Sequence, residues 1–371
     1  MGIVGGGQLG RMLTIAAHKL GFRVIILDPT PNSSAGQVAD KQIVGSFKDE
    51  EKIKELAKEV EFLTFEIELA NAKILEELTT QGLKINPSAK TLTIIKDKLL
   101  QKEFLKKSHI ATAEFIPVET KEDIADAAKM FGYPVLLKAR FDAYDGRGNA
   151  LIKSSTDIVK GMKKLQGRLL YVEKFVPFTK ELSVVIARST KGDIAPYPVV
   201  ETIHKNNICH TVIAPAPVDT EMKNQAYDLA ISVMEHLGGA GVFGIEMFLR
   251  KDGKVLVNEI APRVHNSGHH TIEANETSQF EQHIRAITDM PLGRTDMIVP
   301  AAVMVNILGE REGKAKPQGV ENATNLTGVF VHLYGKMETR RERKMGHITA
   351  IGNTVEEAWE KAEKARKYIT I

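Results

Sequence analysis

Residues 244–260, GIEMFLRKDGKVLVNEI, carry the clearest structural pattern in the chain. Two runs of β-forming residues flank a Lys-Asp-Gly-Lys segment, and Asp-Gly between such runs is a strong signal for a β-hairpin. If Asp252 and Gly253 form a two-residue turn, Glu246 lies directly opposite Glu259. The stretch therefore predicts an antiparallel hairpin on which two carboxylates face each other.

These opposed carboxylates need a positive partner, because like charges directly across a sheet destabilise it. Mg²⁺ prefers hard oxygen ligands and commonly bridges ATP phosphates, which makes Glu246 and Glu259 candidate metal ligands. Two alternatives stay open: both glutamates are exposed on a wet sheet face, or a neighbouring Arg or Lys neutralises them. In ideal alternation Asn258 points to the opposite face.

A glycine-rich loop over Phe141–Ala150 is a candidate cradle for phosphates, since the chain has no Walker A sequence. Its Asp145-Gly146-Arg147-Gly148 segment offers backbone N–H groups and one guanidinium. Lys138 precedes the loop in an apolar run, where a phosphate oxygen would satisfy its ammonium group. The alternative is an edge-strand lysine that extends to solvent. With the hairpin downstream, the loop favours a nucleotide-triphosphate site.

The N-terminal glycines Gly5, Gly7 and Gly10 form a G-x-G-x-x-G pattern between a strand and a helix, and Asp28 ends the next strand. Taken alone, this pattern is typical of a dinucleotide site. It is equally compatible with a tight strand-to-helix turn, or with a helix N-terminus that binds a different anion. No hydride-transfer site follows downstream, so the later residues favour the alternatives to a dinucleotide.

Three regions follow from the predicted secondary structure. Alternating strands and helices at the N-terminus predict a parallel sheet. From Ala111, closely spaced strands with interleaved helices predict a mixed α+β region, and a smaller β-rich region follows Pro291. A capping box at Thr354 and Glu357 is expected to start the last helix. The predicted helices are Arg11–Leu20, Lys48–Lys58, Thr91–Lys107, Lys121–Met130 and Glu221–Leu237; the predicted strands are Met1–Val4, Arg23–Leu27, Phe62–Phe65, Val135–Ala139, Leu169–Val176, Leu182–Ser189, Ile194–Val200, Ala301–Ile307 and Gly328–Leu333.

The composition narrows the class of protein. The chain has 371 residues and a formal net charge of +3, which disfavours a dedicated nucleic-acid binder. Its single cysteine excludes an intrachain disulfide framework and fits a reducing compartment. No apolar run reaches the roughly 18 residues of a membrane span, and no signal peptide is expected. We therefore expect a cytoplasmic protein that binds neither nucleic acid nor membrane.

Several blocks together resemble a known family. Residues 5–12 (GGGQLGRM), 144–148 (YDGRG), 258–269 (NEIAPRVHNSGH), 334–336 (YGK) and 343–347 (RKMGH) are similar to the 5-(carboxyamino)imidazole ribonucleotide synthases of the ATP-grasp superfamily. The blocks span almost the whole chain in the family's order. The resemblance implies an ATP-grasp fold with an N-terminal Rossmann-like domain at 1–90, an ATP-grasp domain at 91–290 with a lid at about 111–176, and a small β-rich C-terminal domain at 291–371.

The resemblance also implies an activity and its site. The family carboxylates the exocyclic amine of 5-aminoimidazole ribonucleotide with bicarbonate and ATP, through carboxyphosphate, in purine biosynthesis, and it implies a homodimer. Mg²⁺ would be held by Glu246 and Glu259, in agreement with the hairpin register. The implied ATP-binding residues are Lys98, Lys138, Ala143, Tyr144, Asp145, Gly146, Arg147, Gly148, Asn149, Glu173, Lys174, Phe175, Val176, Glu181, His204, Asn258 and Glu259.

The remaining implied roles concern the other two substrates. Arg263, His265 and Asn266 follow the Glu259 strand on an irregular turn suited to bicarbonate or carboxyphosphate. The nucleotide substrate would contact Gln8 and Leu9, with its phosphate near Lys336, Arg343 and Lys344; without the resemblance, the last three would be interpreted as a solvated charge run. The implied catalytic residues are Arg263, His265, Asn266, Tyr144, Asp145, Arg147 and Lys336.

Two positions depart from the family pattern. Where the family more often has glycine before the Tyr-Asp-Gly-Arg-Gly segment, this chain has Ala143, which is expected to stiffen the loop. Where it more often has arginine, this chain has Lys98, which keeps the charge but loses the bidentate fork for phosphate.

Overall fold

The N-terminal strands form a parallel sheet, as the strand–helix alternation predicts. A computed structural model of the chain describes residues 1–142 and 148–371, and its first sheet has the order β3-β2-β1-β4-β5 with every pair parallel. The edge strands β3 and β5 were not predicted, because they are short and partly polar. The elements are β1 (Gly2–Val4), α1 (Gln8–Lys19), β2 (Ile25–Asp28), β3 (Lys41–Val44), α2 (Glu50–Ala57), β4 (Phe62–Phe65), α3 (Ala72–Thr80) and β5 (Lys84–Ile85).

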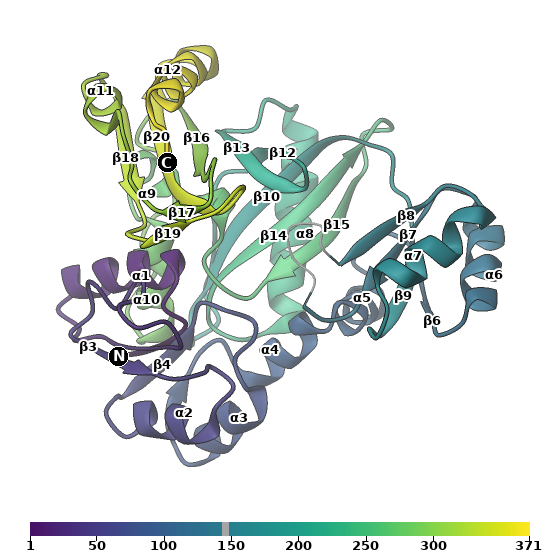
Figure 1. Cartoon of the computed structure of the whole chain (residues 1–371), viewed down its shortest axis with the longest axis horizontal. Helices are drawn as coiled ribbons and strands as arrows, with labels where there is room; N and C mark the ends of the chain where they lie inside the picture. The colour runs from purple at the N-terminus through teal and green to yellow at the C-terminus, as the bar shows by residue number, and fades with distance from the viewer. Residues whose placement is uncertain (143–147) are drawn as a thin grey trace.

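A four-stranded antiparallel sheet and two helices form the lobe at the right of Figure 1. Its strand order is β6-β9-β7-β8, and α6 and α7 pack on it around a core that includes Ile124, Leu137 and Val172. The elements are β6 (Phe115–Val118), α6 (Lys121–Phe131), β7 (Val135–Ala139), β8 (Asn149–Ile152), α7 (Ile158–Lys164) and β9 (Leu170–Lys174).

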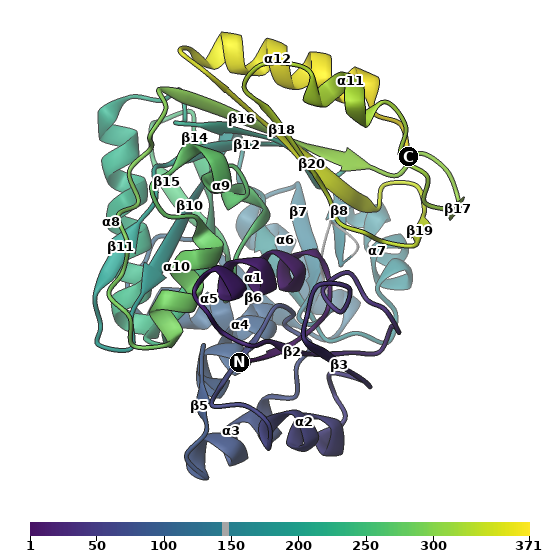
Figure 2. The ribbon, with the colours of Figure 1, turned by 90° about the vertical axis from the view of Figure 1, so that its left-hand side faces the viewer.

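A nine-stranded sheet joins the central and C-terminal parts of the chain. Its order is β15-β14-β10-β12-β13-β16-β20-β18, with β11 beside β10, so β16 continues the sheet from β13. The helix α12 crosses the C-terminal strands in Figure 2 and packs on β16 and β20. The strands are β10 (Phe178–Arg188), β11 (Ile194–Pro196), β12 (Val200–Lys205), β13 (Ile208–Ala214), β14 (Gly241–Arg250), β15 (Val255–Ala261), β16 (Ala301–Leu308), β18 (Val329–Leu333) and β20 (Lys344–Gly352).

The two faces of this sheet differ where β10 and β14 lie. The helix α8 (Thr220–Leu237) covers one face, where Leu182, Ile245 and Met247 pack against its apolar side. Ser183 on β10 and Glu246 on β14 are paired neighbours on the opposite face. The helix α10 (Gln279–Ile287) packs against α1 and joins the N-terminal region to the central sheet. One face is therefore core, and the other carries these polar groups and a second core, with Val185 and Ala187, toward α10.

Two predicted elements are interrupted. The single helix expected over Thr91–Lys107 is two helices, α4 (Ala89–Lys96) and α5 (Lys98–Lys107). Asp97 caps α5 through the N–H groups of Leu99 and Leu100, and this cap is the reason for the break. The predicted strand Ile194–Val200 is also divided between β11 and β12, because the prolines at 196 and 198 cannot donate to a ladder.

The start of α12 (Val355–Tyr368) follows the prediction in part. The Thr354 hydroxyl accepts a hydrogen bond from the Glu357 N–H at 3.2 Å. The Glu357 carboxylate, however, accepts from the Asn353 N–H at 2.8 Å, one residue before the position expected in a capping box. Among the described residues, no helix combines the length and hydropathy that a membrane span needs.

Candidate active site

The hairpin over residues 244–260 has the predicted pairing for a different local reason. Glu246 on β14 faces Glu259 on β15, as predicted. The turn, however, holds three residues, since Arg250 pairs with Lys254 and Gly253 has a φ of 79°. A β-bulge at Asn258 then shifts the register by one residue and restores the pairing of the two glutamates. The bulge also interrupts the alternation, so Asn258 and Glu259 are both half-buried.

Glu246 lies on the polar face, where no lysine or arginine of the described part of the chain forms an ion pair with it, although the charge of Lys344 partly opposes the rise of its pKa that burial causes. The basic side chain in contact with it is the His265 imidazole, whose Nε2 lies 3.4 Å from the carboxylate. Burial raises the pKa of Glu246 to about 7, and the Glu259 carboxylate adds to the shift. A divalent cation between the two carboxylates would relieve this repulsion, and two hard oxygen donors fit such a cation.

Glu259 has a partner from α5. Lys98 Nζ lies 2.5 Å from Glu259 Oε1 and 3.7 Å from Glu68 Oε2. Burial alone would raise the pKa of Glu259, but the Lys98 ammonium outweighs burial and lowers it. Arg263 Nη2 extends the charge network, 3.2 Å from Glu68 Oε1. A neighbouring lysine, one of the alternatives left open by the sequence, therefore neutralises one of the two carboxylates.

Lys138 on β7 is paired with a buried carboxylate of the neighbouring strand. Its Nζ lies 3.2 Å from Glu173 Oε1, and the Tyr171 ring centroid is 5.9 Å away. The other Glu173 oxygen lies 2.8 Å from Lys102 Nζ. Gly148 and Asn149 are adjacent to Lys138 in the sheet. The alternatives considered from sequence, a phosphate or the solvent, did not include this internal ion pair.

Glu181 and His204 meet farther along the polar face. Glu181 Oε1 on β10 lies 3.1 Å from His204 Nδ1 on β12. Burial opposes protonation of His204, but the Glu181 carboxylate raises its pKa. Two residues expected to bind ATP are therefore in contact, although 23 positions separate them in sequence.

The turn after β15 holds the three residues expected to bind bicarbonate. His265 Nδ1 lies 2.8 Å from Ser267 Oγ, and burial, with Arg263 nearby, holds the pKa of His265 well below its usual value. Asn266 is buried, and its amide exchanges two hydrogen bonds with the Asn306 amide, at 2.7 and 3.1 Å. His265 therefore lies beside Glu246 and Arg263 beside Glu68, while Asn266 connects the turn to β16 through Asn306.

The N-terminal glycine turn is occupied by the protein's own carboxylates. Glu66 accepts hydrogen bonds from the N–H groups of Gly7 at 2.7 Å and Gly10 at 3.1 Å. Asp28 accepts from the Gly6 N–H at 2.8 Å. The dinucleotide interpretation is therefore wrong for this turn, because the donors that would meet a pyrophosphate are already satisfied. The anion at this helix N-terminus is a side chain of the same protein.

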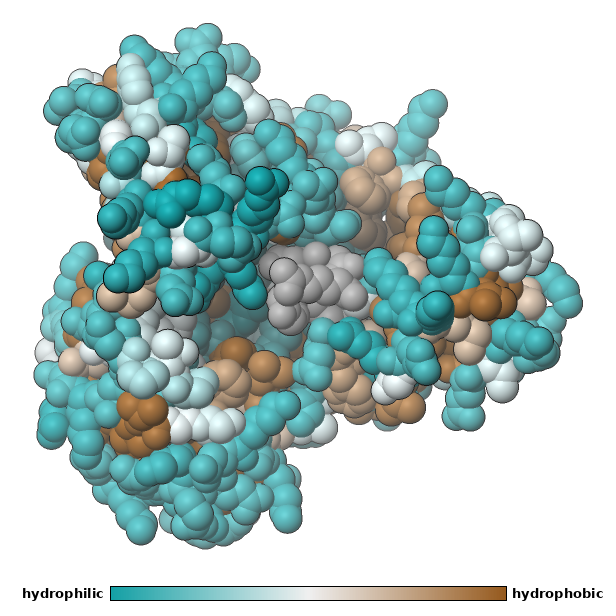
Figure 3. All heavy atoms as spheres, in the orientation of Figure 1, coloured by the Kyte–Doolittle hydropathy of each residue, from teal (hydrophilic) through white to brown (hydrophobic). Residues whose placement is uncertain are grey.

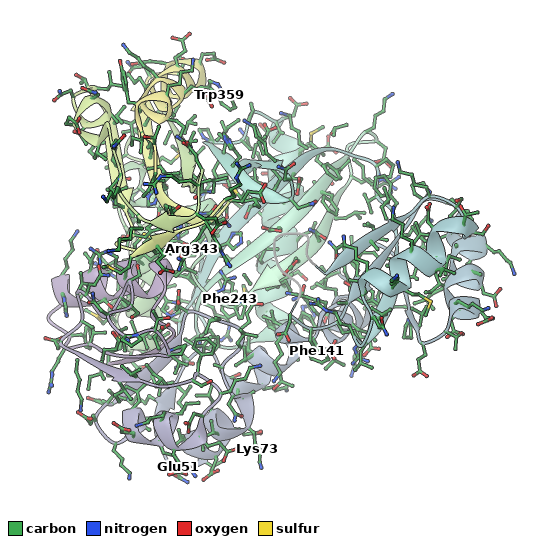
Figure 4. The ribbon with its side chains drawn as sticks, viewed as in Figure 1. Glu51, Lys73, Phe141, Phe243, Arg343 and Trp359 are labelled. Carbon is green, nitrogen blue, oxygen red and sulfur yellow. The ribbon has the colours of Figure 1, made fainter. Side chains whose placement is uncertain are left out.

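The C-terminal basic segment lies at the junction with the N-terminal region. Lys336 Nζ donates to the Lys344 carbonyl at 2.6 Å, and Arg343 Nη1 donates to the Glu338 carbonyl at 2.6 Å. Burial, with Arg343 nearby, lowers the pKa of Lys336 to about 7. Figure 4 labels Arg343 at the edge of the C-terminal strands that faces α1. The segment is therefore a partly buried cationic cluster, in contrast to a solvated charge run.

The N-terminal region holds this segment by its backbone. Gln37 Nε2 donates to the Gly335 carbonyl at 2.7 Å, and the Ser34 hydroxyl donates to the Tyr334 carbonyl. Gln8 begins α1, whereas Leu9 is buried in the core between α1 and α10. Figure 3 shows the surface hollowed where the lobes meet.

The structure brings several pairs of the predicted site residues together, and their roles stay predictions. Lys174 pairs with Glu114 at 2.5 Å, and Phe175 is partly exposed between β9 and β10. Sequence reasoning missed Glu66, Glu68 and Lys102, whose partners are distant in sequence. Ala143, Tyr144, Asp145, Gly146 and Arg147 lie outside the described residues.

Three domain families match successive parts of the chain. Residues 1–96 match the ribonucleotide synthetase preATP-grasp domain, residues 103–280 the ATP-grasp domain, and residues 302–361 the phosphoribosylaminoimidazole carboxylase C-terminal domain.

Solved structures resemble the whole chain. The crystal structure of N5-carboxyaminoimidazole ribonucleotide synthetase from Thermotoga maritima is 50% identical, with a TM-score of 0.90 over 100% of this chain and 98% of that one. The N5-carboxyaminoimidazole synthase from Aspergillus clavatus, in complex with ADP and 5-aminoimidazole ribonucleotide, is 38% identical, with a TM-score of 0.92 over 99% and 97% of the two chains.

Curated relatives fall into two lengths. The N5-carboxyaminoimidazole ribonucleotide synthase of Bacillus subtilis is 38% identical over 94% of this chain and 90% of its own. The phosphoribosylaminoimidazole carboxylase of Ogataea methanolica is 46% identical over 96% of this chain. The chain spans 64–67% of the length of that carboxylase and of the similarly named relatives from other fungi and a plant.

Proposed function

The chain belongs to the N5-carboxyaminoimidazole ribonucleotide synthase family of ATP-grasp ligases, and on that premise we propose that it carboxylates 5-aminoimidazole ribonucleotide with bicarbonate and ATP. The products are 5-(carboxyamino)imidazole ribonucleotide, ADP and phosphate, and the reaction belongs to purine biosynthesis. The observation that carries the proposal is the Glu246–Glu259 pair, set on a polar sheet face within reach of Lys98 and His265.

The divalent cation is the first element of this proposal. Glu246 and Glu259 would hold Mg²⁺, whose charge offsets the triphosphate and favours phosphoryl transfer. The fit rests on the shared sheet face of the two carboxylates and on the raised pKa of Glu246, which burial and Glu259 produce. With a cation held by the two carboxylates, Lys98 would be free to turn from Glu259 to a phosphate.

The chain's own residues position ATP. Lys138, beside Gly148 and Asn149, would contact phosphate oxygens, and the backbone of 173–176 would receive the adenine at the end of β9. Glu181 and His204 would orient the ribose. The loop residues Tyr144, Asp145 and Arg147 would close over the reactants, with Asp145 orienting the amine.

The chemistry then takes place in two transfers. A bicarbonate oxygen attacks the γ-phosphorus and ADP leaves, which gives carboxyphosphate. The amine nitrogen attacks the carboxyl carbon, the bond from carbon to the phosphate oxygen breaks, and the nitrogen loses a proton. Arg263 and His265 would hold bicarbonate beside the carboxylates, and Asn266 would anchor their turn through Asn306. Held reactants lower the entropic part of the barrier, and exclusion of water protects carboxyphosphate.

The second substrate would bind at the junction of the N-terminal and C-terminal regions. Lys336, Arg343 and Lys344 would contact its phosphate, and Gln8 and Leu9 would contribute from α1. We also propose the domain division 1–90, 91–290 and 291–371 with a lid at 111–176, a homodimer, and action in the cytoplasm. Sedimentation equilibrium tests the dimer.

An ADP-release assay tests the function. ADP should form at a substantial rate only when ATP, Mg²⁺, bicarbonate and 5-aminoimidazole ribonucleotide are all present. ATP binding without substrate-dependent ADP release would instead indicate a nucleotide sensor, and saturable micromolar NADH binding would support a dehydrogenase.

A further inference from the structure

Lys102 is a buried lysine to which neither the resemblance nor the proposed function gives a role. It lies on α5, four residues after Lys98, and only 2% of the residue is exposed. Lysine rarely occupies such a position unless its charge is compensated. Its Nζ lies 2.8 Å from Glu173 Oε2 and donates a hydrogen bond to Thr112 Oγ1 at 2.9 Å.

Glu173 is shared between two lysines on opposite sides. Lys102 contacts one carboxylate oxygen and Lys138 the other; burial lowers the pKa of Lys102, and the Glu173 carboxylate opposes that shift. The side chain of Lys102 is 2% exposed and that of Lys138 is 13% exposed. Lys102 is therefore the closed end of the triad, and Lys138 is its accessible end.

The structure assigns Lys102 as a positioning residue that keeps Glu173 neutralised, so that Lys138 can leave this carboxylate for an ATP phosphate. This inference rests on the proposed function of Lys138. When Lys138 moves to a phosphate, Glu173 remains paired with Lys102 and no buried charge is left uncompensated. Without Lys102, the same movement would strand a carboxylate whose side chain is 2% exposed, and Lys138 would instead remain on Glu173.

The surroundings of Lys102 fit this role. Thr112 Oγ1, which accepts from Lys102, itself donates to the Val257 carbonyl on β15 at 2.8 Å. The ammonium group therefore contacts Glu173 on β9 directly, and Thr112 links it to β15, the strand that carries Glu259. This fixed geometry lets Lys102 act on Glu173 from a buried position, with only 2% of its side chain exposed.

A double-mutant cycle tests the inference in the full chain. We would compare Lys102→Met, Glu173→Gln and the double variant, with Lys107→Met as a matched control from the exposed side of the same helix. Lys102→Met should raise the KM for ATP roughly 10- to 100-fold, because it leaves Lys138 as the sole partner of a buried carboxylate. The KM for 5-aminoimidazole ribonucleotide should stay within about threefold, since a single site is affected.

The double variant separates charge compensation from packing. It removes both the buried carboxylate and its counter-ion, so its ATP affinity should be better than the two single effects combined predict. Additive effects, or a Lys102→Met variant that matches Lys107→Met, would overturn the inference. If Lys102→Met does not fold, comparison of the double variant with Glu173→Gln still decides. Once the carboxylate is gone, the inference requires Lys102 to have little further effect, so a double variant that binds ATP much more weakly than Glu173→Gln would overturn it.

Titration calorimetry with MgATP measures the same cycle without turnover. Wild-type protein that binds MgATP but shows no substrate-dependent ADP release would refute the proposed carboxylation and leave the test of Lys102 intact. Coupled binding energies with normal turnover in the wild type would support both.

Discussion

The N-terminal glycine turn holds a buried carboxylate and the β14–β15 hairpin holds two half-buried ones, and different kinds of group compensate them. At the turn, Glu66 accepts hydrogen bonds from the backbone of Gly7 and Gly10. At the hairpin, Glu259 is paired with the side chain of Lys98, and no lysine or arginine among the described residues forms an ion pair with Glu246. A side chain can rotate to another partner, whereas the backbone of a helix N-terminus cannot. The hairpin can therefore exchange its internal partner for a ligand, and the turn is closed.

The largest effect should come from removal of one hairpin carboxylate. Glu259→Gln should lower the rate of ADP release by at least roughly 10³-fold, because metal-assisted phosphoryl transfer depends on fixed charge. The change also leaves Lys98, whose side chain is 9% exposed, without its main partner. Glu360→Gln, an exposed change of the same chemistry on α12, should retain wild-type turnover. Near-normal turnover by Glu259→Gln would show that the hairpin, like the glycine turn, binds no ligand that the reaction needs.

A second change tests the cationic segment of the C-terminal region, which lies against the N-terminal region near the glycine turn. Lys336→Ala should raise the KM for 5-aminoimidazole ribonucleotide roughly 10- to 100-fold, through the loss of a partly buried charge beside its phosphate. The KM for ATP should change little, since Lys336 contacts the Lys344 backbone at the junction with the N-terminal region. Steady-state kinetics with each substrate varied in turn measures both values. An unchanged KM for the ribonucleotide would refute this placement.

The same contrast explains what could be predicted from sequence. The pairing of Glu246 with Glu259 depends on a hairpin, whose register is local, so it was accessible from 17 residues of sequence even though the turn length was wrong. The partner of the glycine turn lies 59 residues from Gly7, and nothing local indicates that Glu66 occupies it. The resemblance supplied the fold, which the matching families and solved structures confirm, and a set of site residues that stays a prediction, because both follow motifs in sequence order.

The buried ion pairs were inaccessible for the same reason. Lys102 and Glu173 are on different elements and 71 positions apart, and each alone is typical of a solvated surface residue. The break between α4 and α5 was missed because apolar and basic residues continue at helical spacing on both sides of Asp97, although aspartate is a weak helix former and a preferred N-cap. Only its cap of α5 and its ion pair with Arg140, at 2.5 Å, make it a boundary.

A steric change tests whether the glycine turn is closed. A Cβ at Gly7 would lie 2.6 Å from Glu66 Oε1, which is too close for a normal contact. Gly7→Ala should therefore lower the free energy of unfolding by about 1–3 kcal/mol. Thermal unfolding measures the loss, and Glu66→Ala in the same chain should recover part of it by removing the clash. A Gly7→Ala variant as stable as wild type would mean that the turn is open enough for a ligand.

The smallest expected effect is a pH dependence at the boundary between these regions. Burial, with Arg343 nearby, lowers the pKa of Lys336 to about 7, so the side chain loses its charge as the pH rises through 7. The kcat/KM for 5-aminoimidazole ribonucleotide should therefore fall about fivefold between pH 7 and pH 8, because this ratio reports the free enzyme. Lys336→Arg should flatten that slope, since a guanidinium stays charged over the whole range, even if its different shape lowers the absolute value. Equal slopes in the two proteins would assign the titration to another group. Lys336 would then keep its charge over this pH range, and the junction would resemble the glycine turn in having a charge that does not change.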